Sequence, residues 1–273
     1  MKNLLLVTIA AAILVLTACN NNEESNVVRV GLTGAFNVQW NTIRDMVAEE
    51  GVILEFVFFS DFMTPNLALD SGDIDINAFQ HRAFLANEIN ARGYEIQEIA
   101  ITHIVPLNIF NNPARISSLN DITDGHTIAI PSDLINLSRA LRLLESAGLI
   151  RLNPPAQGEL FSTLDVEYIV NINIISAESG MLAGILPDVE AAIINGGNAV
   201  AAGLSPANDS IFREIIDDEH AWGLTNIIAA RTEDVEAAGH RMELFEIIIR
   251  AHHTELIREL ILEEFQGAFI PQW

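Results

Sequence analysis

Cysteine is almost missing from this 273-residue chain, since Cys19 is the only one. A single cysteine cannot close a disulfide within the chain, so the stability of the fold has to come from packing. If its thiol carries an acyl group, as the residues around it indicate below, a catalytic cysteine is excluded as well.

Basic residues are also scarce. The chain has 14 Lys and Arg against 37 Asp and Glu, a formal net charge of −23 at pH 7, and without residues 1–18 and their one Lys the charge is −24. A surface this acidic repels nucleic acid and anionic lipid head groups, which argues against both as partners. We therefore expect the ligand to be a small molecule.

The N-terminus has the pattern of a secreted lipoprotein. Lys2 precedes an apolar run, Leu4–Leu16, that is too short to span a bilayer, and Leu16-Thr17-Ala18-Cys19 ends it. We predict a signal peptide over 1–18, lipidation with acyl chains such as palmitate at Cys19, and a flexible tether over 19–26. The protein would then be anchored on the extracytoplasmic face of a membrane, at the cell surface or in the periplasm. The alternative is a core cysteine near an ordinary signal.

From Val27 onward, short β-branched runs alternate with amphipathic stretches, a pattern typical of α/β architecture with largely parallel sheets. The strands predicted are Val27–Thr33, Ile53–Phe59, Ile74–Asn77, Ile128–Ile130, Asn171–Ser176, Ala191–Ile194 and Leu224–Ala230. The helices predicted are Gln39–Glu49, Pro65–Ser71 with Thr64 as N-cap, Arg82–Ala91, one around Leu137–Leu144, Val235–Arg250 and Thr254–Phe265. A second α/β unit begins near Val105-Pro106.

One candidate site follows a strand that ends at Asn77. Phe79 and His81 come next, at the mouth of the following helix. Open α/β sheets bind ligands outside the carboxyl ends of their strands, which favours a site here. In the alternative reading, Phe79 belongs to the core and His81 satisfies the helix terminus.

A second candidate opens the helix around Leu137. Asn136 and Arg139 are three residues apart and so share a helix face, which we expect to point outward while the leucines face the core. A helix N-terminus and a guanidinium suit a carboxylate ligand. The alternative is a solvated arginine paired with Asp133 or Glu145.

A third candidate is Asn195, which ends an apolar strand before Gly196-Gly197 and can both donate and accept hydrogen bonds. Its alternative role is to cap the turn. We expect His240, His252 and His253 to lie on a solvated helix face and not to bind zinc. No nucleophile motif or phosphate loop is present, so we predict no enzyme, no cofactor and no metal.

These segments resemble the NlpA-type lipoproteins, the methionine-binding components of bacterial ABC importers. Residues 61–69 (DFMTPNLAL) and 72–81 (GDIDINAFQH) are similar to the family's DYxxPNxAL and GDIDANAFQH, and 131–144 resembles PNDPTNxxRALxLL. The similarity extends over Gly148-Leu149-Ile150 and the C-terminal Gly267…Trp273, and is weakest between Asn153 and Leu186.

The resemblance implies a type II periplasmic-binding-protein fold, with two α/β lobes joined by two hinge crossings near Ile104–Phe110 and Trp222–Ala229. One lobe would combine 27–106 with 223–273, and the other would be 107–222. By the same resemblance the side-chain pocket would be lined by Phe62, Phe79, His81 and Phe84, and the amino and carboxylate groups would be held by Asn136, Arg139 and Asn195. The family usually has tyrosine at positions 62 and 84, and threonine and tyrosine after Asn195.

The resulting hypothesis is a monomeric, lipid-anchored solute-binding protein. It would capture L-methionine, a related small amino acid or a methionine-containing dipeptide and deliver it to an ABC permease and its ATPase. Two other classes stay open. One is an interaction lipoprotein, an adhesin or adaptor with a vestigial cleft, and the other is a hydrolase that uses His81 with Asp73 or Asp75.

Overall fold

The computed structural model describes residues 25–34, 38–155, 160–266 and 268–273. The predicted signal peptide, Cys19 and the tether up to residue 24 lie outside them. Among the helices that are described, none combines the length and the apolar character needed to cross a bilayer. Asn26, near the end of the predicted tether, is tied down: its amide donates to Gly51 O at 3.1 Å, and its oxygen pairs with the His240 ring at 2.8 Å.

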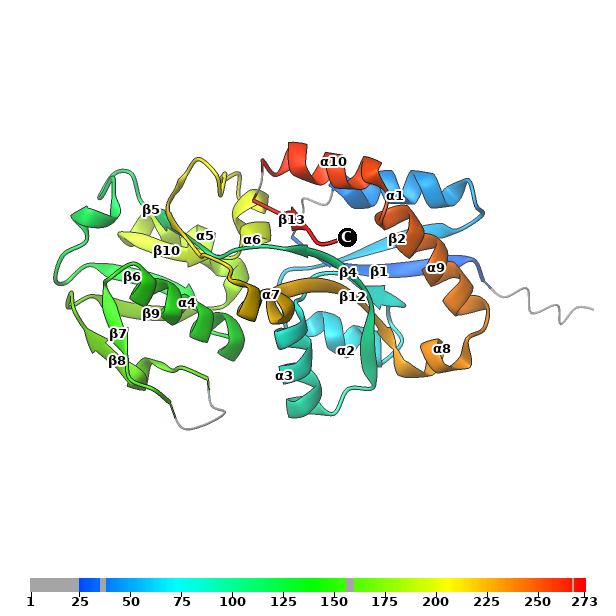
Figure 1. The fold of residues 1–273 in the computed structure, drawn as a ribbon, viewed down its shortest axis with the longest axis horizontal. Helices are drawn as coiled ribbons and strands as arrows, with labels where there is room; N and C mark the ends of the chain where they lie inside the picture. The colour runs from blue at the N-terminus through cyan, green and yellow to red at the C-terminus, as the bar shows by residue number, and fades with distance from the viewer. Residues whose placement is uncertain (1–24, 35–37, 156–159, 267) are drawn as a thin grey trace, which may run out of the picture.

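The chain forms two α/β lobes that lie side by side (Figure 1). The strands are β1 (Val27–Thr33), β2 (Ile53–Phe59), β3 (Ile76–Asn77), β4 (Ile96–Ile104), β5 (Asn108–Asn111), β6 (Thr127–Pro131), β7 (Ile150–Leu152), β8 (Val166–Tyr168), β9 (Asn173–Ala177), β10 (Ala191–Ile194), β11 (Ser210–Arg213), β12 (Thr225–Arg231) and β13 (Ile270–Pro271). Lobe 1 contains the six-stranded sheet β13-β4-β12-β3-β1-β2, and lobe 2 contains the five-stranded sheet β11-β5-β10-β6-β9. A small β7-β8 hairpin completes the strands described.

Both sheets are mixed, where the sequence pattern predicted largely parallel ones. In lobe 1, β1 runs parallel to β2 and β3, but β12 is antiparallel to β3 and β4. In lobe 2, β6 is parallel to β9 and β10, while β5 is antiparallel to β10 and β11. The reversed strands are β12 and β13 in lobe 1 and β5 in lobe 2. Of these, β5 and β12 are the strands with which the chain enters a lobe after each link.

The helices pack on the faces of these sheets (Figure 1). They are α1 (Val38–Ala48), α2 (Thr64–Asp70), α3 (Arg82–Arg92), α4 (Leu134–Ser146), α5 (Leu182–Ile185), α6 (Gly196–Ala201), α7 (Asp218–Leu224), α8 (Thr232–Ala237), α9 (His240–His252) and α10 (Glu255–Glu264), with 3-10 turns η1 (Leu119–Asp121), η2 (Thr163–Asp165), η3 (Ser179–Met181) and η4 (Leu186–Asp188). Each lobe buries its own apolar core. In lobe 1 the inward face of β1 packs on α1, α9 and α10, and in lobe 2 α4 packs on β6 and β10.

Two stretches of chain link the lobes. The first leaves β4 after Ile104 and enters β5 at Asn108. The second runs from the end of β11 to the start of β12, includes α7, and so begins earlier than the expected Trp222–Ala229. The fold is therefore of the type II periplasmic-binding-protein kind, and the lobe boundaries at 106/107 and 222/223 stay predictions.

Two helix ends differ from the prediction. The expected helix Val235–Arg250 is two helices, α8 and α9, because Ala238 adopts a left-handed conformation (φ 47°) and ends α8. Thr64 is the first residue of α2 and not its N-cap. Asp61 takes over the capping role, since one oxygen accepts from the amides of Met63 and Thr64 at 2.8 and 2.7 Å.

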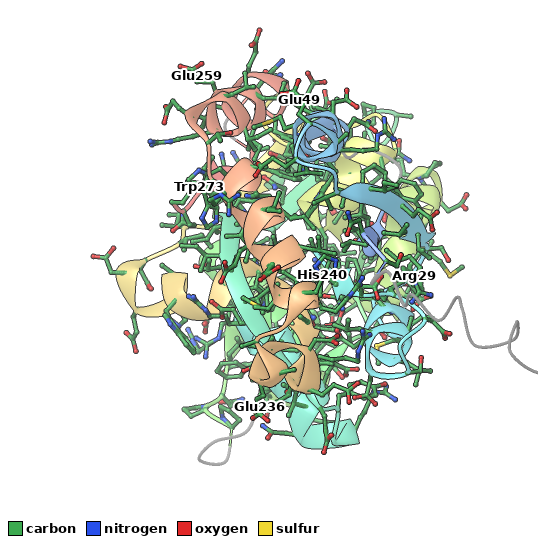
Figure 2. The ribbon with its side chains drawn as sticks, turned by 90° about the vertical axis from the view of Figure 1, so that its right-hand side faces the viewer. Arg29, Glu49, Glu236, His240, Glu259 and Trp273 are labelled. Atoms are coloured by element: carbon green, nitrogen blue, oxygen red, sulfur yellow. The ribbon has the colours of Figure 1, made fainter. Side chains whose placement is uncertain are left out.

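The charge is carried on the outside of the molecule. Glu49, Glu236 and Glu259 are exposed and project from the ends or outer faces of the helices of lobe 1 (Figure 2). Such groups lie in water and contribute nothing to the apolar cores of the lobes.

Candidate functional site

The two lobes enclose a pocket with about 890 Å³ of empty space, part of it open to solvent. All seven residues proposed from the sequence lie in its wall. Lobe 1 supplies Phe62, Phe79, His81 and Phe84, and lobe 2 supplies Asn136, Arg139 and Asn195. Residues separated by more than a hundred positions therefore meet in one cleft, which is where the fold places ligands.

The lobe 1 side of the pocket is a group of three phenyl rings. Phe62 lies 6.0 Å from Phe79 and 6.4 Å from Phe84, and Phe79 lies 6.0 Å from Phe84, measured between ring centroids. Phe84 is 3% exposed, while the other two are partly exposed within the cleft. Three rings that turn edges and faces toward one another form an apolar wall suited to an aliphatic or thioether side chain.

A buried cluster of amides lies behind this wall. The Asn66 and Gln80 side chains bond to each other reciprocally at 2.8 and 2.6 Å, and Asn77 donates to Asn66 at 3.0 Å. All three are at most 2% exposed. The sequence placed Asn77 among the polar groups near the site. In the structure Asn77 helps to hold in place the loop that carries Phe79 and His81.

His81 has two roles at once. It is the N-cap of α3, where its Nδ1 accepts the Phe84 amide at 3.2 Å, as the alternative reading expected. It also lines the pocket, and its buried Nε2 has no hydrogen-bond partner. Burial, and then the charge of Arg139, lower the pKa of His81 to about 3, with smaller opposing effects from Asn136 and the Gly223 backbone. The ring is therefore neutral at pH 7, and because Nδ1 accepts, the proton sits on Nε2 as a free donor.

Arg139 is buried, where the sequence analysis expected it to point outward. It is 8% exposed, because the outer face of α4 at its N-terminal end forms the wall of the cleft. Its Nη1 donates to Asn136 Oδ1 at 3.1 Å, which confirms that these two residues share a helix face. The alternative reading, a solvated arginine paired with Asp133 or Glu145, is wrong as well, since Arg139 pairs with Glu214 at 2.6 Å and Asp133 caps α4 through the Asn136 amide.

Asn195 occupies the N-cap position of α6 but makes no capping bond with its side chain. Its Nδ2 donates to Asn136 Oδ1 at 3.3 Å, and its buried Oδ1 has no partner. The next residue, Gly196, lies against the first link, where a Cβ atom would overlap Val105. The close approach of lobe 2 to the link explains why this position holds glycine.

Several residues of the site were missed from the sequence. Asn226 lines the pocket and its backbone bridges to His81. The polar pair Thr225-Asn226 before the apolar part of β12 was a signal that could have indicated it. Glu214 has no such signal, because only the fold brings it to Arg139.

A deeper part of the pocket extends into lobe 1 and contains His252, which was expected on a solvated face. It is 0% exposed, and its ring nitrogens have no partner. Gln39 Oε1 and His103 Nδ1 line the same pocket and are also buried without partners. Burial lowers the pKa of His103 to about 4 and the pKa of His252 well below 6.5. The reason for the wrong prediction is that α9 packs between α1 and the C-terminal tail, so both of its faces at this end are covered.

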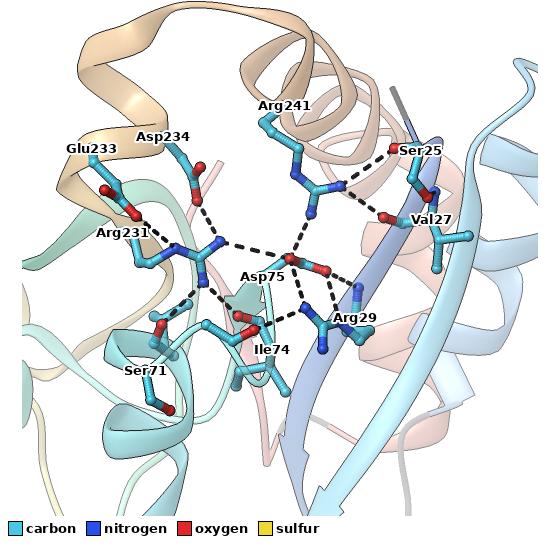
Figure 3. A network of polar contacts seen from close by, with 12 residues as sticks. Ser25, Val27, Arg29, Ser71, Ile74, Asp75, Arg231, Glu233, Asp234 and Arg241 are labelled. Atoms are coloured by element: carbon cyan, nitrogen blue, oxygen red, sulfur yellow. Dashed lines mark hydrogen bonds and ion pairs between the residues drawn. The ribbon is translucent and has the colours of Figure 1, made fainter. Parts of the chain in front are cut away.

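The carboxylates once considered as partners of His81 have other contacts. Asp75 is 5% exposed and is held by three arginines, Arg29, Arg231 and Arg241, with ion pairs of 3.3, 3.6 and 2.7 Å (Figure 3). Asp73 accepts from Ser71 Oγ at 3.1 Å. Within the described residues neither carboxylate contacts His81, and Asp75 joins β1, β3, β12 and α9 at the end of the sheet.

Comparison with known proteins gives the same picture over nearly the whole chain. The family model described as NlpA lipoprotein matches residues 28–273. Outer membrane lipoprotein 3 of Mannheimia haemolytica is 36% identical over 262 residues, 95% of either chain, and the D-methionine-binding lipoprotein MetQ of Salmonella typhimurium is 34% identical over 266 residues, 95% of this chain and 94% of the relative. A solved structure, a nutrient binding protein from Burkholderia cenocepacia bound to methionine, is 31% identical with a TM-score of 0.81, and the match covers 90% of this chain and all of that one.

Proposed function

The chain belongs to the NlpA lipoprotein family, and from that premise we propose that it is a lipid-anchored, extracytoplasmic solute-binding protein that captures methionine for an ABC importer. Cys19 would carry the lipid and hold the binding lobes near the permease and its ATPase. The protein would act as a monomer that closes its lobes on the ligand, so that no bond is made or broken.

The observation that carries this proposal is a pair of unsatisfied polar atoms of opposite kind in one pocket. His81 Nε2 is a buried donor without a partner, and Asn195 Oδ1 is a buried acceptor without one. Arg139 also lines the pocket, and among the described residues of the wall it is the only one that carries a charge at pH 7. Buried polar groups are nearly always paired, so the pocket calls for a ligand that supplies both an anion and a donor.

An amino acid meets this requirement. Its carboxylate would accept from Arg139 and His81 Nε2, its ammonium would donate to Asn195 Oδ1, and its side chain would lie on the rings of Phe62, Phe79 and Phe84. A thioether on an aromatic ring contributes roughly 0.3–1.5 kcal/mol per contact, which favours methionine over an aliphatic chain of similar length.

The test is titration calorimetry of the acyl-free protein, residues 20–273, after unfolding and refolding to remove any bound ligand. The panel contains L- and D-methionine, leucine, norleucine, a methionine-containing dipeptide and 3-methylthiopropylamine, which lacks the carboxylate. We expect methionine to bind most tightly and the amine to give no heat. If no amino acid or dipeptide in the panel binds, the solute-binding role is refuted and an interaction lipoprotein becomes the better hypothesis.

A further inference from the structure

The guanidinium of Arg139 is already paired on the side away from the pocket. Glu214, in the second link, accepts from Nη2 through Oε2 at 2.6 Å and from Nε through Oε1 at 3.1 Å. The two side chains are 9% and 14% exposed. Two parallel charge-assisted bonds of this kind fix the plane of the guanidinium as well as its position.

Glu214 is itself firmly held. Its Oε2 accepts the Leu107 amide at 2.8 Å, and its own amide donates to Leu107 O at 2.9 Å, so it is bonded to the start of β5 on both its side chain and its backbone. Arg139 Nη2 also donates to Val105 O at 3.3 Å in the first link. The ion pair therefore sits where α4 meets both links between the lobes.

The arrangement changes the charge that a ligand meets. Arg139 lines the pocket and Glu214 does not, so the ligand faces the guanidinium while the carboxylate stays behind it. His81 contributes no charge at pH 7, because its pKa is about 3. The charges of Arg139 and Glu214 thus sum to zero before any ligand enters, although Arg139 is the only charged side chain that the described part of the wall presents to the ligand.

We propose that Glu214 sets the net charge of the ligand, by neutralising Arg139 from behind so that the pocket accepts a zwitterion and discriminates against an anion. This inference rests on the proposed function. A buried arginine without a counter-charge would attract any carboxylate. An arginine neutralised by a glutamate can still donate hydrogen bonds to the ligand, but the pair has no net charge. A ligand that brings its own ammonium leaves the closed pocket neutral, and a ligand without one leaves an uncompensated negative charge in a low-dielectric site.

The experiment compares two ligands with the same side chain. Methionine is a zwitterion, and 4-(methylthio)butanoic acid is the same molecule without the amino group and so has a net charge of −1. Dissociation constants of both are measured by calorimetry for the wild type and for Glu214→Gln, which keeps an amide oxygen for the Leu107 N–H. We expect the preference of the wild type for methionine to fall at least ten-fold in Glu214→Gln, because the anion now meets an unneutralised arginine.

Two further variants separate charge from structure. Glu214→Asp keeps the negative charge and should retain the wild-type preference even if both affinities fall, so an equal loss of preference in the Asp and Gln variants would overturn the inference. Glu190→Gln is the matched control, since Glu190 of lobe 2 also combines an arginine pair, with Arg115 at 2.7 Å, and a backbone bond, from the Thr127 amide at 2.7 Å, but lies outside the pocket. Its preference should equal that of the wild type.

The outcomes distinguish this inference from the proposed function. Wild-type protein that binds methionine, together with an unchanged preference in Glu214→Gln, refutes the role of Glu214 alone and leaves the solute-binding function standing. Wild-type protein that binds neither ligand refutes both. Should Glu214→Gln fail to fold, the wild type decides alone, because the inference requires methionine to bind more tightly than 4-(methylthio)butanoic acid, and equal affinities would overturn it.

Discussion

At the scale of single residues, the site consists of groups that would be costly to bury without their partners. An arginine taken out of water needs a counter-charge, and Glu214 supplies it in the structure, so Arg139 can stay ordered while one edge of its guanidinium faces the ligand. His81 and Asn195 keep one atom each unsatisfied. Such unpaired atoms lower the stability of the ligand-free protein, and a ligand that supplies the missing hydrogen bonds restores this loss.

The first prediction concerns Arg139. Arg139→Ala removes the cation that faces the ligand carboxylate and leaves Glu214 buried without its partner, so we expect the affinity for methionine to fall at least ten-fold, about 1.4 kcal/mol or more. Arg142→Ala is the control, because Arg142 lies three residues further along α4, is exposed and stacks on Phe161. Calorimetry that gives the two variants the same affinity would contradict the assignment.

The second prediction concerns the buried histidine of α9. The pKa of His252 lies well below 6.5 in the folded protein, so below pH 6.5 the unfolded chain binds a proton that the folded one does not. Stability is therefore highest above pH 6.5 and is lost as the pH falls.

We expect His252→Phe to abolish this part of the acid sensitivity, measured as the difference in the free energy of urea unfolding between pH 7 and pH 5. The phenyl ring can occupy the space between Trp40 and Trp273 without leaving polar atoms unpaired. His220→Phe serves as control, because His220 is exposed. If wild type and His252→Phe lose the same unfolding free energy between pH 7 and pH 5, His252 is not kept neutral in the folded protein.

At the scale of elements, the ligand-binding loop depends on contacts between α2 and the segment after β3. Asn66 on α2 bonds to both Asn77 and Gln80, and thereby fixes the chain on either side of Phe79. The helix itself carries none of the residues proposed to touch the ligand. Its part in the site is to hold a neighbouring loop in place through buried amides.

The third prediction tests this support. Asn66→Ala removes the three hydrogen bonds that the Asn66 side chain makes with Asn77 and Gln80, so we expect a loss of roughly 2 kcal/mol in unfolding free energy, together with weaker methionine binding. Leu67→Ala, the next residue of the same helix, is 54% exposed and should change neither quantity appreciably. Chemical denaturation and calorimetry on the two variants provide the measurement, and an Asn66→Ala protein of wild-type stability would rule out the supporting role.

At the scale of the whole molecule, the lobes also touch each other outside the pocket. Gly180 in η3 of lobe 2 approaches Ser60 of lobe 1 so closely that a Cβ atom would overlap the Ser60 carbonyl oxygen. On another side, Asn208 donates to Gln266 at 3.0 Å, and Gly34 lies against Ala201. These contacts join the two lobes at residues that do not line the pocket.

The fourth prediction follows from the contact at Gly180. Gly180→Ala places a methyl group where the lobes meet, which disfavours closure, so we expect the affinity for methionine to fall about ten-fold while the melting temperature of the ligand-free protein stays unchanged. Gly184→Ala is the matched control, because no atom lies within 4 Å of its added Cβ. Equal affinities of the two variants would mean that this contact between the lobes is not needed for binding.

Much of the fold could be predicted from local sequence patterns. The bounds of β1, β2 and β10 are those predicted, because these strands are bounded by turn residues and alternate or run apolar in a way that only a strand satisfies. The break at Ala238 was missed, although Gly239, the N-cap of α9, interrupts the predicted helix at this point. The mixed strand directions were also not predicted from the sequence, because the order and direction of strands in a sheet depend on contacts between segments far apart in the chain.

The sequence by itself provided the proposed groups of the site, since Phe79, His81, Asn136, Arg139 and Asn195 stand near strand ends and helix starts, and the family resemblance implied Phe62 and Phe84. Only the tertiary structure decided how these groups are paired. It buried Arg139 and put Glu214 behind it, it enclosed His252, and it brought Asn226 beside His81. The physical reason is that residue type and local periodicity specify what a side chain can do, whereas its charge partner and its access to water depend on segments that meet only when the chain has folded.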